Sequence, residues 1–268
     1  MMTRLSKLQF LLISLTSTLC AQIVPITYDF DSYQNNSDTA GYEGSGHWTG
    51  SNGWSTTTHG GSLFISATDS HDGSNYIRFT DSGSGVGGTA FIENTFGTLR
   101  TDERFSFSFS YLDSNHWGTS VGFGSQSRAG VALTASASSG LSLTLNGASV
   151  GSFASNYSGP ESWHDFRVDL DLGANGGSGL ASVFSRITGE SAWAPVTDMA
   201  DLNLGLDVTR TAADSANPLN WDTLWFHHEG ATSGIDNISV SAIPEPSTYA
   251  ALFGAAVFGV ALWVRRKR

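Results

Sequence analysis

The sequence predicts an all-β protein, an antiparallel β-sandwich, from three observations. Residues 103–112 alternate strictly, with Phe105, Phe107, Phe109 and Tyr111 separated by serines, as in a strand with one buried face. Clusters of Gly, Asn, Asp and Ser separate this segment from others with the same period of two, and such clusters are typical of turns. No window of ten or more residues shows the periodicity of an amphipathic helix.

The expected strands follow one another at short intervals. The alternation is clearest in residues 103–112, 141–145, 166–172 and 202–208. Further strands are expected at residues 26–30, 62–67, 75–80, 89–96, 130–135, 180–187, 222–226 and 235–241. Turns are expected between these strands, where Gly, Asn, Asp and Ser gather: at residues 81–88, at Asn146-Gly147 and at residues 173–179. About a dozen short strands with regular turns indicate a sandwich.

One domain, residues 22–243, is expected to hold all of these strands. No Pro- or Ser-rich linker and no fixed-period repeat interrupts it, and the composition changes only at Pro244. The nearest approach to a linker is Ser241-Ala242-Ile243.

Residues 1–21 have the three-part pattern of a secretory signal peptide. Arg4 and Lys7 precede an apolar stretch from Leu8 to Leu19, and Cys20-Ala21 follows, which predicts cleavage after Ala21. In the alternative, Cys20 is the acylated residue of a lipoprotein. Cleavage after Ala21 leaves a mature chain without cysteine, so that disulfides and thiol catalysis are excluded.

The last 25 residues, 244–268, predict a membrane segment. After Pro244-Glu245-Pro246 and two polar residues, 16 mostly apolar positions run from Tyr249 to Val264, enough for a helix of roughly 24 Å. Arg265, Arg266, Lys267 and Arg268 then end the chain and are expected to stop transfer and stay in the cytoplasm. The alternative is that residues 249–264 form a buried core helix.

This order of motif, apolar helix and basic cluster resembles the PEP-CTERM sorting signal of Gram-negative bacteria. The resemblance implies that Pro244, Glu245 and Pro246 are recognised by an exosortase, a membrane transpeptidase, after passage through the export machinery. It also implies transient anchoring in the inner membrane, followed by display at the cell surface or in the extracellular matrix.

The charge of the exported region limits its partners. Residues 22–243 contain seven arginines, no lysine and 23 Asp or Glu residues, for a net charge of −16. Nucleic acid and anionic lipid need a cationic face and are therefore not expected as partners. The acidic surface fits cations, polysaccharide or simple solubility.

Two short sequence motifs late in the domain resemble a particular group of β-sandwich folds. Residues 162–168, with Trp163-His164-Asp165, and residues 234–240, with Ile235-Asp236-Asn237-Ile238, resemble the concanavalin-like and laminin-G-like jelly rolls. The resemblance implies that the first and last strands are neighbours, which would bring Asp31 near Asp236. Oxygen ligands in such proximity could bind a structural calcium ion. Alternatively, both aspartates bond to backbone groups at strand ends.

No catalytic residue is predicted. The Glu-x-Asp-x-x-Glu pattern of concanavalin-like glycosidases is absent, and Asp169 and Asp171 alternate with apolar residues, so they are expected to face solvent. His227 and His228 are adjacent in an expected strand and should point to opposite faces, away from any shared metal ion.

Three tryptophans in polar, glycine-rich stretches, Trp48, Trp54 and Trp117, are candidates for stacking on sugar rings. In the alternative they cover sheet edges or the core, where Trp163, Trp221 and Trp225 are expected. We therefore expect a non-enzymatic surface or matrix protein, and the resemblance of its tail to the PEP-CTERM signal implies an association with exopolysaccharide. A carbohydrate-binding module and an atypical glycan-cleaving enzyme remain the alternatives.

Overall fold

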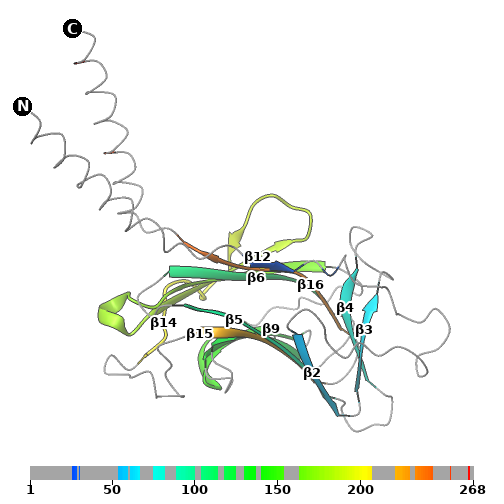
Figure 1. The fold of residues 1–268 in the computed structure, drawn as a ribbon. Helices are drawn as coiled ribbons and strands as arrows, with labels where there is room; N and C mark the ends of the chain where they lie inside the picture. The colour runs from blue at the N-terminus through cyan, green and yellow to red at the C-terminus, as the bar shows by residue number, and fades with distance from the viewer. Residues whose placement is uncertain are drawn as a thin grey trace, which may run out of the picture.

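The fold is seen in a computed structural model that describes residues 26–28, 30, 54–59, 61–66, 75–81, 89–99, 104–113, 118–124, 130–136, 140–153, 163–206, 221–229 and 233–243, together with Gly254 and Arg265. Within these ranges the strands form two stacked antiparallel sheets (Figure 1). The all-β antiparallel sandwich expected from the sequence is thereby confirmed.

The larger sheet has nine strands in the described part of the chain. Its order is β13 (Ala194–Pro195), β12 (Leu180–Ile187), β11 (Trp163–Asp171), β6 (Arg104–Asp113), β16 (Ser233–Ala242), β4 (Tyr76–Asp81) and β3 (Gly61–Ser66). Two short strands attach beside this path, β1 (Ile26–Tyr28) to β16 and β14 (Leu202–Asn203) to β12. The first and last strands are therefore paired, as the sequence predicted.

The other sheet has seven described strands. Its order is β10 (Ala148–Phe153), β9 (Gly140–Leu145), β8 (Gly130–Ser136), β7 (Gly118–Gly124), β15 (Trp221–Glu229), β5 (Thr89–Leu99) and β2 (Trp54–His59). It arches so that its concave side is turned away from the nine-stranded sheet (Figure 1). Outside the strands, the short 3-10 helix η1 spans Asn175–Gly177.

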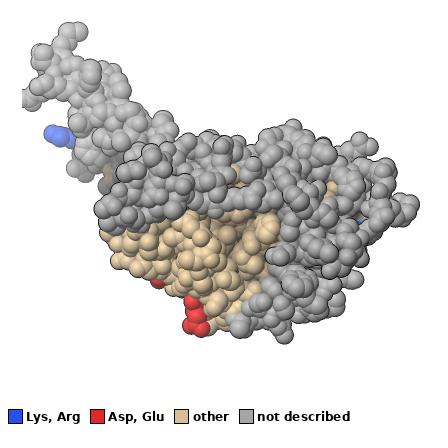
Figure 2. Space-filling view, turned by 90° about the horizontal axis from the view of Figure 1, so that it is seen from below, with Lys and Arg blue, Asp and Glu red and all other residues tan. Residues whose placement is uncertain are grey.

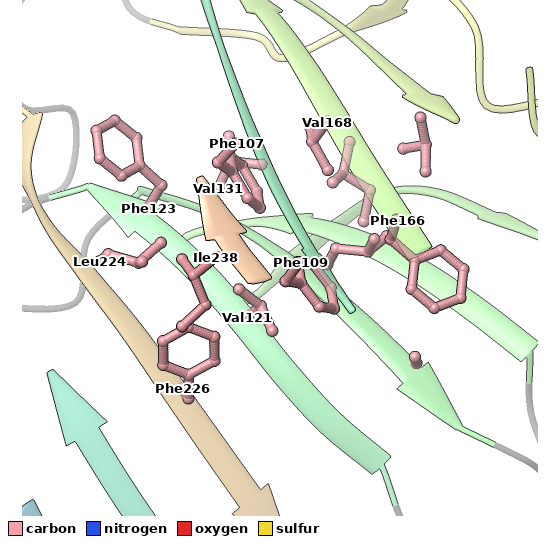
Figure 3. Close-up of a cluster of buried hydrophobic side chains, with 14 of the residues drawn as sticks. Phe107, Phe109, Val121, Phe123, Val131, Phe166, Val168, Leu224, Phe226 and Ile238 are labelled. Carbon is pink, nitrogen blue, oxygen red and sulfur yellow. The ribbon is translucent and has the colours of Figure 1, made fainter. Parts of the chain in front are cut away.

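The core lies between the two sheets and consists of the alternating apolar residues of both. Phe105 and Phe107 of β6 contact Phe123 of β7, with ring centroids 4.8 and 6.2 Å apart. Phe109 contacts Phe166 of β11 at 5.7 Å. Side chains from both sheets interdigitate in this layer (Figure 3). Each is buried because successive residues of a strand point to opposite faces.

The turn at Asn146-Gly147 was correctly predicted and fixes the β9–β10 hairpin. Both residues have positive φ, 51° and 80°, as a two-residue hairpin turn requires. The Asn146 side chain also accepts a hydrogen bond of 2.8 Å from the N–H of Gly130, which ties the turn to the start of β8.

Two details of the sequence prediction are wrong. Residues 202–208 were expected to form one strand, but β14 ends at Asn203, because Gly205 has a φ of 66° and its N–H bonds to the Asn203 side chain at 2.9 Å. Ser241 and Ala242 belong to β16 rather than to a linker, and the N–H of Ile243 bonds to the carbonyl of Arg104 at 2.8 Å. The sandwich therefore continues to Ile243.

Candidate functional site

The outer face of the seven-stranded sheet is one candidate surface. On β7 to β10 the residues between the buried ones are small and uncharged, and we call this set the hydroxyl face: Ser120, Gly122, Ala132, Thr134, Ser142, Thr144, Ser149 and Ser152. Ser120 and Thr134 share a hydrogen bond of 2.7 Å across β7 and β8. Viewed from this side, the described surface carries Asp and Glu only near its edge (Figure 2).

Trp225 of β15 lies beside the hydroxyl face. It alternates with Leu224 and Phe226, whose side chains are in the core, and it is paired with Gly122. A Cβ atom at Gly122 would lie 2.1 Å from Cε2 of Trp225, so the indole occupies the space that the glycine leaves. Trp225 is only 5% exposed and is therefore no free stacking platform.

The expectation that Trp163, Trp221 and Trp225 plug the core is wrong for two of them. Trp163, like Trp225, is buried on the outer side of its sheet, where it packs edge-on against Tyr76 at 5.1 Å in a small cluster with Leu112. The side chain of Trp221 is outside the described part of the structure. Outer-face tryptophans of this kind cover the sheets rather than fill the space between them.

His227 and His228 point to opposite faces, as predicted. His227 is half-buried on the outer side, while His228 is buried between the sheets and its ring stacks on Phe79 at 5.1 Å. The Nδ1 atom of His228 lies 3.0 Å from the hydroxyl of Thr119 and 2.9 Å from that of Ser233. This cluster links strands of both sheets and accounts for His228 as a structural residue.

The outer face of the nine-stranded sheet carries a second candidate surface, centred on the buried carboxylate of Asp165. It accepts hydrogen bonds from the Ser110 hydroxyl at 2.8 Å, the Thr188 hydroxyl at 2.6 Å and Nε of Arg186 at 2.7 Å. The partners come from β6, from the segment after β12 and from β12 itself. Asp165 therefore holds three segments in one geometry.

Asp169 and Asp171, the two aspartates considered for catalysis, lie on this same outer face, as predicted. The alternating residues of the strand are buried on the other face: Phe166, Val168, Leu170 and Leu172. Asp169 pairs with Arg167 at 2.9 Å and Asp171 pairs with Arg104 at 3.0 Å. Burial raises the pKa of Asp169, and the two arginines oppose that shift.

His164 is partly buried, and burial lowers the pKa of its imidazole. The negative charge of Asp165 acts in the opposite direction and raises that pKa, but burial has the larger effect.

Trp193, which the sequence analysis did not single out, lies over these arginines. Its ring centroid is 4.3 Å from Cζ of Arg186 and 5.2 Å from Cζ of Arg167. Arg167 also lies over the ring of Phe184 at 4.3 Å. We call Trp193, Phe184, Arg167 and Arg186 the Trp193 platform. No local sequence motif indicates it, because β11 and β12 supply the arginines and the chain after β12 supplies the indole.

Of the predicted calcium ligands, Asp236 is described and Asp31 lies outside the described residues. Asp236 is fully buried at a bulge of β16 and accepts a contact of 3.5 Å from the amide of Asn237. Among the described residues there is no group of three or more His, Cys, Asp or Glu side chains that could hold a metal ion.

The remaining predicted sites are covered only in part. Trp48 and Trp117 lie outside the described residues, and for Trp54 only the backbone, paired with Asn94, is described. Pro244, Glu245, Pro246, Arg266, Lys267 and Arg268 also lie outside them, while Arg265 is helical and exposed. Within the described part of the chain no helix is long and apolar enough to span a membrane. The signal peptide and the helix over residues 249–264 stay predictions.

Comparison with protein families confirms the C-terminal signal. Residues 242–267 match the family model of the PEP-CTERM protein-sorting motif. A comparison with curated proteins found no match.

Solved structures resemble the sandwich. The Ca2+-bound exoplasmic/lumenal domain of VIP36 is 10% identical, with coverage of 72% of this chain and 84% of that one, and a TM-score of 0.50. A conserved carbohydrate esterase of the Shiga toxin-encoding bacteriophage phi24B is 14% identical (82% and 98% coverage, TM-score 0.45). The Emp46p carbohydrate recognition domain is 7% identical (70% and 88% coverage, TM-score 0.42). At such identities the likeness to VIP36 shows the fold alone, an antiparallel β-sandwich of two sheets.

Proposed function

We propose that this chain is an exported, non-enzymatic protein of the cell surface or extracellular matrix that associates with exopolysaccharide. The observation that carries the proposal is the continuity of β16 with the sorting motif: the strand ends at Ala242, where the matched motif begins. A PEP-CTERM motif implies export, exosortase processing and sorting to the cell surface. The sandwich is then the part that is displayed.

Polysaccharide is supported as the partner by the charge of the surface. The hydroxyl face presents serine and threonine hydroxyls without any charged side chain, and neutral hydroxyl groups match the hydroxyl groups of sugars. The net charge of −16 over residues 22–243 disfavours polyanions. A neutral polysaccharide fits both properties.

The non-enzymatic role is supported by the pairing of three carboxylates on the outer face of the nine-stranded sheet. Asp165, Asp169 and Asp171 each pair with an arginine of the same sheet face. A glycan-cleaving enzyme needs one carboxyl group free to transfer a proton. The enzyme alternative therefore needs acidic residues outside these ion pairs.

Sorting is tested with the tagged full chain in a host that has an exosortase. Wild type should yield a processed form at the surface, and Glu245→Ala should accumulate as unprocessed membrane protein. Equal processing of both would contradict the sorting role.

Polysaccharide association is tested with the purified chain by affinity electrophoresis in gels that contain neutral or uronic-acid polymers. Thr134→Arg, which places a charge on the hydroxyl face, should weaken retardation by neutral polymers, and Thr197→Arg, at an exposed position outside that face, should not. Parallel runs with calcium and with chelator test the predicted role of Asp31 and Asp236. Trp48→Ala, Trp54→Ala and Trp117→Ala test the carbohydrate-binding-module alternative.

A further inference from the structure

The Trp193 platform has the features of a built binding surface. Trp193 follows a turn in which Gly189 has a φ of 95° and the N–H of Glu190 bonds to the carbonyl of Ile187 at 3.0 Å. On the other side of Trp193, the buried Val196 donates its N–H to the carbonyl of Val183 at 2.9 Å. The indole is thus held in place by the chain on both sides.

The guanidinium groups below the indole are held as firmly. Arg186 bonds to Asp165, which is only 5% exposed and has two further hydroxyl donors. Arg167 donates a hydrogen bond of 3.1 Å from Nη2 to Asp169, and its Nε lies 2.9 Å from the same carboxylate. A surface whose side chains are already ordered loses little conformational entropy when a ligand binds.

The platform combines a partly exposed indole with hydrogen-bond donors. Both guanidinium groups lie against the ring of the half-buried Trp193, at 4.3 and 5.2 Å from its centroid. Of the three guanidinium nitrogens of Arg186, Nε alone has a hydrogen-bond partner among the described residues. Its two NH2 groups are therefore available to donate hydrogen bonds to a ligand. An indole face beside planar donors suits a ring with axial C–H groups and peripheral hydroxyls.

The charge of the Trp193 platform indicates which class of sugar ring it can bind. Arg167, Arg186 and the neighbouring Arg104 are matched one to one by Asp169, Asp165 and Asp171. The platform therefore has no excess positive charge to attract phosphate or uronate, and the surrounding chain is acidic. A neutral pyranose, unlike phosphate or uronate, is not repelled by the acidic surroundings of the platform.

We propose that the Trp193 platform is a binding site for a neutral hexopyranose unit of a polysaccharide. The sugar stacks on Trp193, and the NH2 groups of Arg186 donate hydrogen bonds to its oxygens. The inference rests on the proposed function for the class of ligand, but the site is on the sheet opposite the hydroxyl face. Ser110, beside Asp165, lies six residues along β6 from Arg104, about 20 Å from the end where the tail leaves.

The test measures binding of neutral hexose oligosaccharides to the full chain, purified in detergent, by calorimetry and saturation-transfer NMR. Trp193→Ala should weaken binding at least tenfold, Trp193→Phe should retain part of it, and Arg186→Lys, which lacks the planar donor fork, should weaken it as well. Because Trp193 is half-buried, thermal unfolding of each variant shows whether the fold is intact, and Trp193→Phe separates lost stacking from lost packing.

The outcomes separate the two proposals. Binding that is lost in Thr134→Arg and unchanged in Trp193→Ala overturns the Trp193 site and leaves the proposed function standing. The reverse pattern supports the Trp193 site and rejects the hydroxyl face. Binding of uronic-acid oligosaccharides alone, weakened by salt, overturns the neutral-sugar assignment. Binding of no glycan by wild type overturns both proposals.

Discussion

Replacing Asp165 should destabilise the sandwich, because its carboxylate holds three segments together on the outer face of the sheet. Asp165→Ala removes the acceptor of three hydrogen bonds. Arg186, whose side chain is 27% exposed, can turn toward water, so its loss is discounted for solvent screening. Ser110 is only 3% exposed and keeps a buried hydroxyl without its acceptor. We expect a loss of about 3 kcal/mol in the free energy of unfolding.

The assay is urea unfolding followed by circular dichroism, with thermal unfolding in parallel. A loss of about 3 kcal/mol corresponds to a drop in Tm of about 6–12 °C for a domain of this size. Asp165→Asn, which keeps one acceptor oxygen, should lose about half as much. Glu190→Ala, an exposed carboxylate in the same hairpin, should change stability by less than about 0.5 kcal/mol. The reasoning fails if Asp165→Ala stays within 1 kcal/mol of wild type.

Three further predictions follow from contacts on either sheet. Gly122→Ala should lower the free energy of unfolding in urea by about 1–3 kcal/mol, because the new methyl group overlaps the Trp225 ring; the double variant with Trp225→Ala should cost less than the sum, and simple additivity would contradict the close contact. Because the pKa of folded His164 is lowered from 6.5, its neutral form contributes stability that is present above pH 6.5 and lost as the pH falls through the lowered value. Tm measured from pH 7.5 to 5 should therefore fall less in His164→Gln than in wild type, and parallel curves would reject this. If both sheet faces bind sugar, the chain should cross-link neutral polysaccharide and raise its turbidity, whereas Trp193→Ala should bind without cross-linking.

The sequence predicts strands well where a strand has an apolar and a polar face. β6 and β11 alternate cleanly and were placed within three residues of their observed bounds. The missed strands β2, β7 and β10 carry Thr, Ser and Gly in at least half of their positions. In β7, Gly122 resembles a turn residue, yet glycine is required there because the Trp225 side chain of β15 fills the space beside it.

The candidate sites were harder to predict, because their residues meet only through strand pairing. Asp165 and Arg186 are 21 residues apart in sequence and become partners when β11 pairs with β12. Trp193 then returns across the same strands. The sorting motif, by contrast, is a contiguous signal, and a contiguous signal needs no fold to be recognised.

The position of β16 also determines how the molecule bears mechanical load. The strand lies between β6 on one side and β4 and β1 on the other, and its end at Ile243 leads into the sorting motif. When flow or matrix tension pulls the sandwich against its tail, the force runs along β16. Hydrogen bonds in an antiparallel sheet lie perpendicular to the strands, so this pull shears the bonds to both neighbours together rather than peeling them one at a time. If the chain is displayed as proposed, its attachment runs through a strand that is hydrogen-bonded on both sides.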